Sequence, residues 1–266
     1  MDSAIPWKRF AAAVALAILA GCGGGGGDTS SGTSASGGNQ PVTNASPGGI
    51  WNGTDGQGLQ VTGIITETGE AYFLDSDGTQ YFGTVTTSGN DLAGSFTGYT
   101  ELGKTFMDGS TSGTGTLTGT VDARSTLSFT TTFNSQGGGE SVDNVLLQYI
   151  QTYAQASSLS TIAGSYTETA NGDVLTVNSD GSALIQESET GCVVNGTVSI
   201  VNASYNAYGV QFSYSGCQGE FAVLNGSTFN GLATLDSAVS PEQLIVGTQA
   251  KVGATGVSII ITFNRT

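Results

Sequence analysis

The side chains of this 266-residue chain that could do chemistry are mostly carboxylates. There are 21 Asp and Glu against six Lys and Arg, and there is no histidine. Histidine is the commonest general base, the commonest metal ligand and the usual third member of a nucleophilic triad. No Gly-x-Ser-x-Gly elbow is present, and a serine–lysine hydrolase would have to use Lys104 or Lys251 without a supporting motif. We therefore expect no catalytic residue, no metal and no cofactor.

Three groups of acidic residues are the candidates for a site. Asp75-Ser76-Asp77-Gly78 is similar to half of a calcium-binding loop. It lacks the third acidic position and the distal glutamate, and Asp-Gly between two β runs also predicts a hairpin turn. The pairs Glu67/Glu70 and Glu187/Glu189 could act as paired carboxylates if they lay roughly 5–10 Å apart in a cleft. Solvated strand edges are the alternative.

Four aromatic residues of one segment allow two interpretations. Tyr205, Tyr208, Phe212 and Tyr214 could line a ligand pocket, or they could pack in a core as cross-strand pairs.

The first residues have the pattern of an export signal. Lys8 and Arg9 precede an apolar run from Phe10 to Ala20. Such a run covers about 16 Å, which is too short to span a bilayer. Leu19-Ala20-Gly21-Cys22 resembles the bacterial lipobox, whose cysteine is diacylated after cleavage before it. That resemblance implies lipidation of Cys22 and a membrane partner through the lipid anchor. A plain secretory signal with an incidental cysteine, or a short buried helix, is the alternative.

The residue after the cysteine bears on sorting. An aspartate there resembles the inner-membrane retention signal of enterobacteria, whereas this chain has Gly23. In a Gram-negative host this favours the outer membrane, on its periplasmic or surface side.

Charge excludes one class of partner. The net charge is −15, and the basic residues beyond the signal (Lys104, Arg124, Lys251 and Arg265) are scattered. They cannot form a stripe that follows a phosphate backbone, so we expect no nucleic-acid binding.

The rest of the chain predicts an all-β protein. Residues 22–47 are rich in Gly, Ser and Thr, which is typical of a flexible tether with a reach of about 25–30 Å. From residue 48, short β-branched runs are separated by turn signals such as Thr68-Gly69 and Ser88-Gly89-Asn90. Their spacing of about 8–12 residues indicates antiparallel barrels or sandwiches.

One segment has the spacing of a helix instead. In residues 141–157 the apolar residues Val142, Leu146, Tyr149, Ile150 and Tyr153 fall on one helical face. We therefore expect one short helix to join two lobes.

A weak internal repeat supports two lobes. Ile162 to Thr167 resembles Gly49 to Thr54, and Asn178-Ser179-Asp180-Gly181 resembles the turn at 75–78. The predicted organisation is a signal peptide (1–21), the lipidated cysteine and linker (22–47), a first β lobe (48–136), the linking helix (137–158) and a second β lobe (159–266).

The two remaining cysteines predict a disulfide. In an exported chain, Cys192 and Cys217 form the one leftover pair, with free thiols as the alternative. They flank two runs that could form a hairpin, with Ile200 opposite Val210 and Val198 opposite Phe212. This register differs by one residue from the one that the cysteines require, so we expect a bulge or a stagger.

The chain as a whole resembles a family of uncharacterised proteobacterial lipoproteins. The resemblance lies in segments such as GIWNGT, FMDGSTSGT and GCVVNGTVSIVNASYNAY, and it covers roughly residues 48–266 plus the lipobox. It implies no activity and no catalytic residues. We expect a non-catalytic binding module of the cell envelope, with an envelope protein or a small molecule as its ligand. A passive structural surface protein and a carboxylate-based hydrolase are the alternatives.

Overall fold

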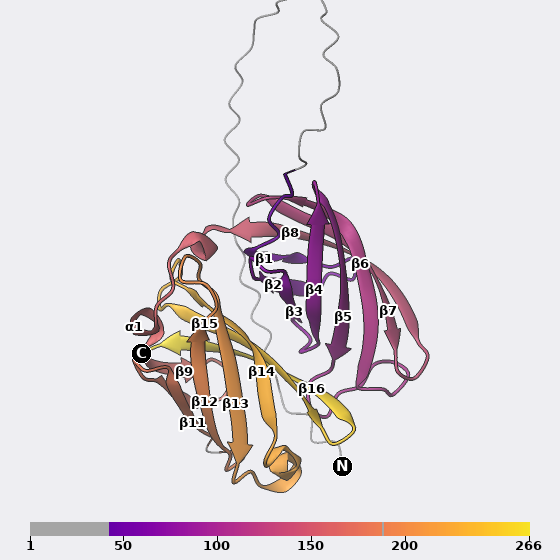
Figure 1. Cartoon of the computed structure of the whole chain (residues 1–266). Helices are drawn as coiled ribbons and strands as arrows, with labels where there is room; N and C mark the ends of the chain where they lie inside the picture. The colour runs from indigo at the N-terminus through magenta and orange to yellow at the C-terminus, as the bar shows by residue number, and fades with distance from the viewer. Residues whose placement is uncertain (1–42, 188) are drawn as a thin grey trace, which may run out of the picture. The chain divides into compact units, whose positions relative to one another are not determined.

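The computed structural model describes residues 43–187 and 189–266, which fold into two closed antiparallel barrels of eight strands each (Figure 1). The prediction of an all-β protein with two lobes is confirmed, and both lobes are barrels. The predicted signal peptide, Cys22 and residues 23–42 of the predicted linker lie outside the described residues.

Both barrels have the simplest strand order, in which each strand pairs with its neighbours in sequence and the last strand pairs with the first. The strands of the first barrel are β1 Gly49–Thr54, β2 Gln60–Ile65, β3 Glu70–Asp75, β4 Gln80–Ser88, β5 Asp91–Tyr99, β6 Ser112–Asp122, β7 Thr126–Ser135 and β8 Glu140–Ile150. Those of the second are β9 Gly164–Glu168, β10 Val174–Val177, β11 Ser182–Gln186, β12 Val193–Ile200, β13 Tyr208–Ser215, β14 Thr228–Asp236, β15 Gln243–Val252 and β16 Thr255–Arg265.

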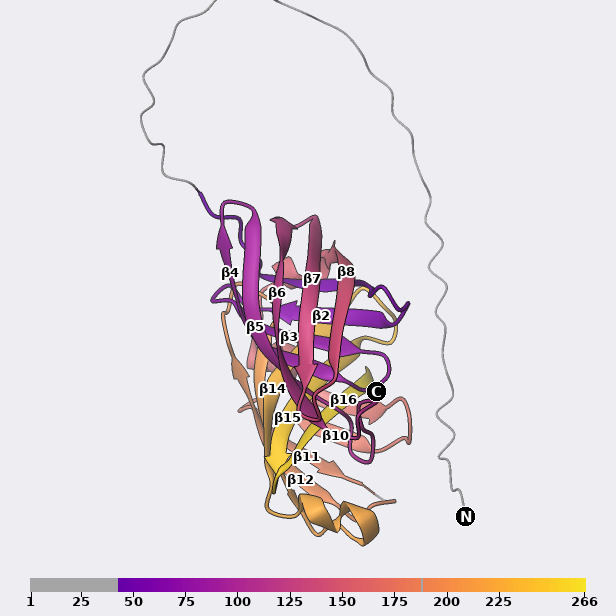
Figure 2. The same ribbon diagram turned by 90° about the vertical axis from the view of Figure 1, so that its right-hand side faces the viewer.

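Alternating side chains explain why these segments are strands. Along β6, Leu117 and Val121 are buried while the threonines between them are exposed, so the apolar side chains fill the barrel and the polar ones face outward. Figure 2 shows β4 to β8 side by side around the first barrel. Glycine makes the tight turns: Gly69 has a φ of +87°, and a Cβ there would lie 2.2 Å from the carbonyl oxygen of Val85.

The predicted helix at 141–157 is wrong for most of its length. Residues 140–150 form β8, which pairs with β7 and β1 and closes the first barrel. The period-two residues Val145 and Leu147 are buried, whereas Val142 and Leu146 of the helical pattern are 62% and 54% exposed. Helical structure follows only as a 3-10 turn, η1 Gln151–Ala154, and the four-residue α1 Leu159–Ile162. The first lobe therefore extends to residue 150, and not to 136.

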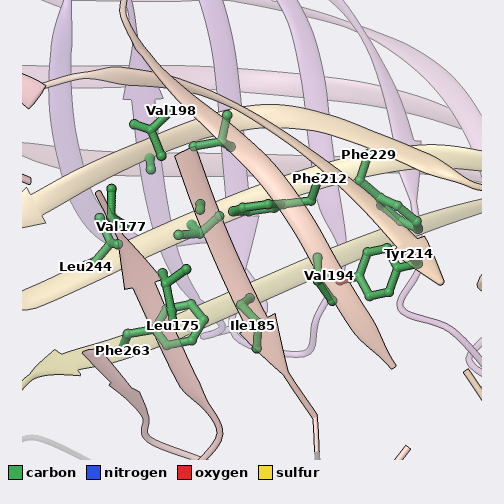
Figure 3. Close-up of a cluster of buried hydrophobic side chains, with 14 of the residues drawn as sticks. Leu175, Val177, Ile185, Val194, Val198, Phe212, Tyr214, Phe229, Leu244 and Phe263 are labelled. Carbon is green, nitrogen blue, oxygen red and sulfur yellow. The ribbon is translucent and has the colours of Figure 1, made fainter. Parts of the chain in front are cut away.

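Aliphatic and aromatic side chains fill the second barrel. Tyr214 and Phe229 meet edge to face, with ring centroids 5.1 Å apart. Figure 3 shows the labelled core side chains gathered among the strands from β10 to β16. The first barrel is filled in the same way, by a cluster in which Tyr81 contacts both Phe96 and Phe133.

The predicted β12–β13 hairpin exists, but its predicted register is wrong. Val198 lies opposite Val210, and Ile200 lies opposite Tyr208. The last pair before the cysteines is Val193 with Ser215, so Cys192 and Cys217 are still offset by one residue. Gly216, with a φ of +73°, lies in this offset. The disulfide between Cys192 and Cys217 is confirmed.

The two pairs of similar segments that suggested an internal repeat differ in their places in the fold. Residues 49–54 and 164–167 both belong to the first strand of a barrel, β1 and β9. The turn at 75–78 joins the third and fourth strands of its barrel, whereas the turn at 178–181 joins the second and third. The first similarity is therefore topological, while the second reflects only a shared turn chemistry.

A third core cluster contains residues of both barrels, among them Ile64 and Leu74 from the first and Leu232 from the second. Glycines on β15 and β16 let these strands approach the first barrel closely. A Cβ on Gly247 would lie 2.5 Å from Leu74, and one on Gly256 would lie 2.3 Å from Tyr99. The Ser258 hydroxyl donates to the carbonyl of Gly78 at 2.7 Å. The barrels thus share a packed contact.

Candidate functional site

The Asp75-Ser76-Asp77-Gly78 segment forms a turn. The carboxylate of Asp77 accepts a hydrogen bond from the amide of Thr79 at 2.8 Å, and Gly78 has a φ of +92°. Among residues 43–187 and 189–266, no group of three or more Asp, Glu, Cys or His could hold a metal ion. The hairpin interpretation therefore explains this segment.

In each glutamate pair, one member is hydrogen-bonded and the other is exposed. Glu67 accepts a hydrogen bond from Ser46 at 2.6 Å, while Glu70 is exposed at the start of β3. Glu187 is half-buried and accepts from Thr190 at 2.5 Å, while Glu189 is exposed. Among the described residues, no hydrogen bond joins the two members of either pair. Lys104 is engaged in a 2.6 Å ion pair with Glu101, and Lys251 is exposed on β15.

A second acidic cluster lies where β9 and β11 end. It comprises Glu168, Asp173 and Glu187. Burial and then the charge of Asp173 raise the pKa of Glu168 from its ordinary 4.5 to about 7. Burial also raises the pKa of Glu187. The sequence reasoning missed Glu168, although it lies two residues beyond the buried Tyr166 and so shares its inward face.

The disulfide anchors the loops at this same end of the second barrel. Both cysteines are buried, and Cys217 is held further by Asn225, whose side chain accepts from the Cys217 amide at 2.9 Å and donates to its carbonyl at 3.0 Å. The bridge therefore fixes the 3-10 segment η2 Gly219–Leu224 beside the cysteines.

The aromatic residues of 205–214 are mostly core. Tyr208, Phe212 and Tyr214 are buried within the second barrel, as one of the two interpretations predicted. Tyr205 is half-buried and stacks on Tyr153, with ring centroids 4.9 Å apart. These four residues therefore belong to packed hydrophobic clusters.

A ligand-sized groove lies on the outer surface instead, with a volume of about 440 Å³. Strands β12, β13 and β14 supply most of its lining, β3 supplies Glu70 and Tyr72, and Val201 directly follows β12. Its lining residues are Glu70, Tyr72, Thr197, Ser199, Val201, Gly209, Val210, Gln211, Asn230, Gly231 and Leu232. Pockets of about 300–1,000 Å³ are typical of small-molecule sites. We call this feature the outer groove.

Hydrogen bonds arrange the polar groups of the outer groove. The side-chain amide of Gln211 donates to Asn230 Oδ1 at 2.8 Å, and Ser199 Oγ donates to the carbonyl of Gly209 at 3.3 Å. Tyr72 is buried at its edge, and burial followed by the charge of Glu70 raises the pKa of the Tyr72 hydroxyl. The hydroxyl is therefore neutral, and it is already hydrogen-bonded to the side chains of Glu70 and Gln249.

Sequence reasoning could not find the outer groove because its residues come from four strands. Of its lining residues, the sequence pointed only to Glu70 and Val210, one for a carboxylate pair and the other for a hairpin register. Thr197, Gln211 and Asn230 are ordinary outward-facing strand residues, and pairing of β12 with β13 and of β13 with β14 is what brings them together.

Three further observations bear on membrane attachment and on similarity to known proteins. Cys22, the predicted lipidation site, lies outside the described residues. Among the described residues, no helix is long and apolar enough to cross a membrane. No protein-family model matches the chain, and no curated protein matches it.

Proposed function

We propose that this protein is a lipid-anchored protein of the bacterial cell envelope whose barrels form a non-catalytic binding module. The observation that carries the binding part is the outer groove, a ligand-sized surface site with convergent polar side chains. Inside the barrels, by contrast, the described side chains pack against one another. The anchor rests on the lipobox resemblance at Cys22.

The binding module is tested by blocking the groove. Ser199→Trp places a large side chain among the lining residues, and Asn195→Trp places the same side chain on the same face of β12 outside them. The full chain, its Ser199→Trp form and its Asn195→Trp form are immobilised and exposed to solubilised envelope extract. We expect the same bound species on the first and third and its loss from the second. Equal recovery on all three would contradict the proposal.

The anchor is tested independently. Labelled palmitate should enter the full chain and should not enter a Cys22→Ala form, which should also leave the membrane fraction. A Cys22→Ala form that takes up the label and stays with membranes would overturn the anchor while leaving the binding module standing.

A further inference from the structure

The outer groove combines neutral polar side chains with a single charge, which is negative. Its lining includes two hydroxyl residues (Thr197 and Ser199), two amides (Gln211 and Asn230) and the carboxylate of Glu70. No Lys or Arg is among these lining residues. A bound anion would have to lie near Glu70 without a counter-charge, and the net charge of −15 would also repel it.

The amide pair is arranged to meet a hydroxylated ligand. The bond between them uses one hydrogen of Gln211 and the oxygen of Asn230. Gln211 Oε1 is therefore left to accept, and Asn230 Nδ2 is left to donate. Each hydroxyl of a sugar ring can both donate and accept, so neighbouring hydroxyls can meet both groups. An apolar ligand would instead strip water from these groups without replacing the hydrogen bonds, which is unfavourable.

The rest of the lining offers only a small apolar surface. Val201 is 39% exposed and offers a small apolar surface beside the polar groups, whereas Leu232 is buried. Gly209 leaves Ser199 accessible, because a Cβ at residue 209 would lie 2.8 Å from Ser199 Oγ. The neutral Tyr72 hydroxyl is hydrogen-bonded to Glu70 and holds that carboxylate at the edge of the groove.

From these groups we infer that the outer groove binds a saccharide that is uncharged or carries an amino group. The inference rests on the proposed binding function and specifies its ligand. Thr197, Ser199, Gln211 and Asn230 bind ring hydroxyls, and Glu70 binds an amino substituent or a further hydroxyl. The site excludes sugars that carry carboxylate, sulfate or phosphate groups.

The experiment measures binding of the purified full chain to an array of defined neutral, amino-bearing and sulfated oligosaccharides, followed by titration of the best binder. We expect neutral or amino-bearing members to bind and sulfated ones to fail. Gln211→Ala and Asn230→Ala should each weaken binding about tenfold, as the loss of one hydrogen-bonding group predicts. Ser199→Trp should abolish binding, whereas Asn195→Trp should leave it unchanged. Glu70→Gln should weaken amino-bearing sugars more than neutral ones.

The outcomes separate this inference from the function on which it rests. Binding of sulfated sugars alone, or binding that Ser199→Trp does not affect, would overturn the inference. If no array member binds while envelope extract still yields a species that depends on the groove, the saccharide assignment is wrong and the binding function stands. If neither the array nor the extract yields binding, both are wrong.

Discussion

Trp51 and Tyr166 hold the same position in the two barrels. Each is fully buried in the first strand of its barrel. Each also donates a hydrogen bond from its polar tip to the carbonyl four residues earlier: Trp51 to Pro47 at 3.1 Å, and Tyr166 to Ile162 at 2.6 Å. The bond ties the segment that enters each barrel to the core.

Removing the Tyr166 hydroxyl should destabilise the second barrel. The hydroxyl also accepts from Arg265 at 2.6 Å, so Tyr166→Phe removes the donor of the buried Ile162 and one acceptor of the partly exposed Arg265. We expect the free energy of unfolding to fall by about 2 kcal/mol. Tyr208→Phe is the matched control, since Tyr208 is equally buried but its hydroxyl bond to Ser158 is long, at 3.4 Å. Urea denaturation measures both, and equal losses would contradict the argument.

Replacing Asn206 should strongly destabilise the protein. Its buried side chain donates to the carbonyls of Thr152 (3.2 Å) and Leu235 (2.6 Å) and accepts from the Leu235 amide at 3.2 Å. Asn206→Ala should cost about 3 kcal/mol of stability. Asn206→Asp should cost more at neutral pH, because its charge would face two carbonyl oxygens. The control is the exposed Asn202, whose replacement by alanine should cost under about 1 kcal/mol in the same denaturation assay.

Stability should fall as the pH rises toward 8. Because the pKa of Glu168 is raised from 4.5 to about 7, the folded state keeps a proton that the unfolded state releases. The stability linked to that proton is present below pH 4.5 and is lost as the pH passes 7. Glu168→Gln should therefore be more stable than the wild type at pH 8, by on the order of 2 kcal/mol, and equal to it at pH 4.

The control for this comparison is Glu140→Gln, at an exposed residue of β8. Thermal unfolding between pH 4 and pH 8 should give this control the same pH dependence as the wild type. A Glu168→Gln form that follows the wild-type pH profile would show that Glu168 is not the group responsible.

The disulfide should stabilise the second barrel through the unfolded state. It joins cysteines 25 residues apart, so its loss should lower stability by about 3 kcal/mol on the chain-entropy account. The double substitution Cys192→Ala with Cys217→Ala should show this loss in urea. Adding a reductant should shift the wild type toward the double variant and leave the variant unchanged. An unshifted midpoint in both cases would refute the prediction.

Replacing Gln80 should stabilise the protein. Gln80 is fully buried, and neither end of its amide has a hydrogen-bond partner among the described residues. A leucine of similar shape removes the buried polar atoms, so Gln80→Leu should raise the free energy of unfolding by about 1 kcal/mol. Gln60→Leu, at an exposed residue of β2, should leave it nearly unchanged. A loss of stability in Gln80→Leu would mean that the amide contributes favourably.

Period-two alternation and turn glycines were enough to predict two β lobes, because both depend on neighbouring residues. The helix predicted at 141–157 was wrong because Val142 and Leu146 fit a helical face as well as the outer face of a strand. Only closure of the barrel decides between helix and strand here, because closure requires β8 to pair with β1, almost a hundred residues earlier. The outer groove has the same origin: Gln211 and Asn230 lie side by side only through pairing of β13 with β14.

The residues that lead into the first barrel are hydrogen-bonded to the β4–β5 hairpin. The amide of Ala45 donates to the carbonyl of Gly89 at 2.8 Å, and Thr87 donates to the carbonyl of Ala45 at 2.8 Å. A pulling force applied at the N-terminal end of the described chain would thus reach the β4–β5 hairpin before it reaches β1. These contacts would therefore break first under force, before the pairing of β1 with β2 and β8 is disturbed.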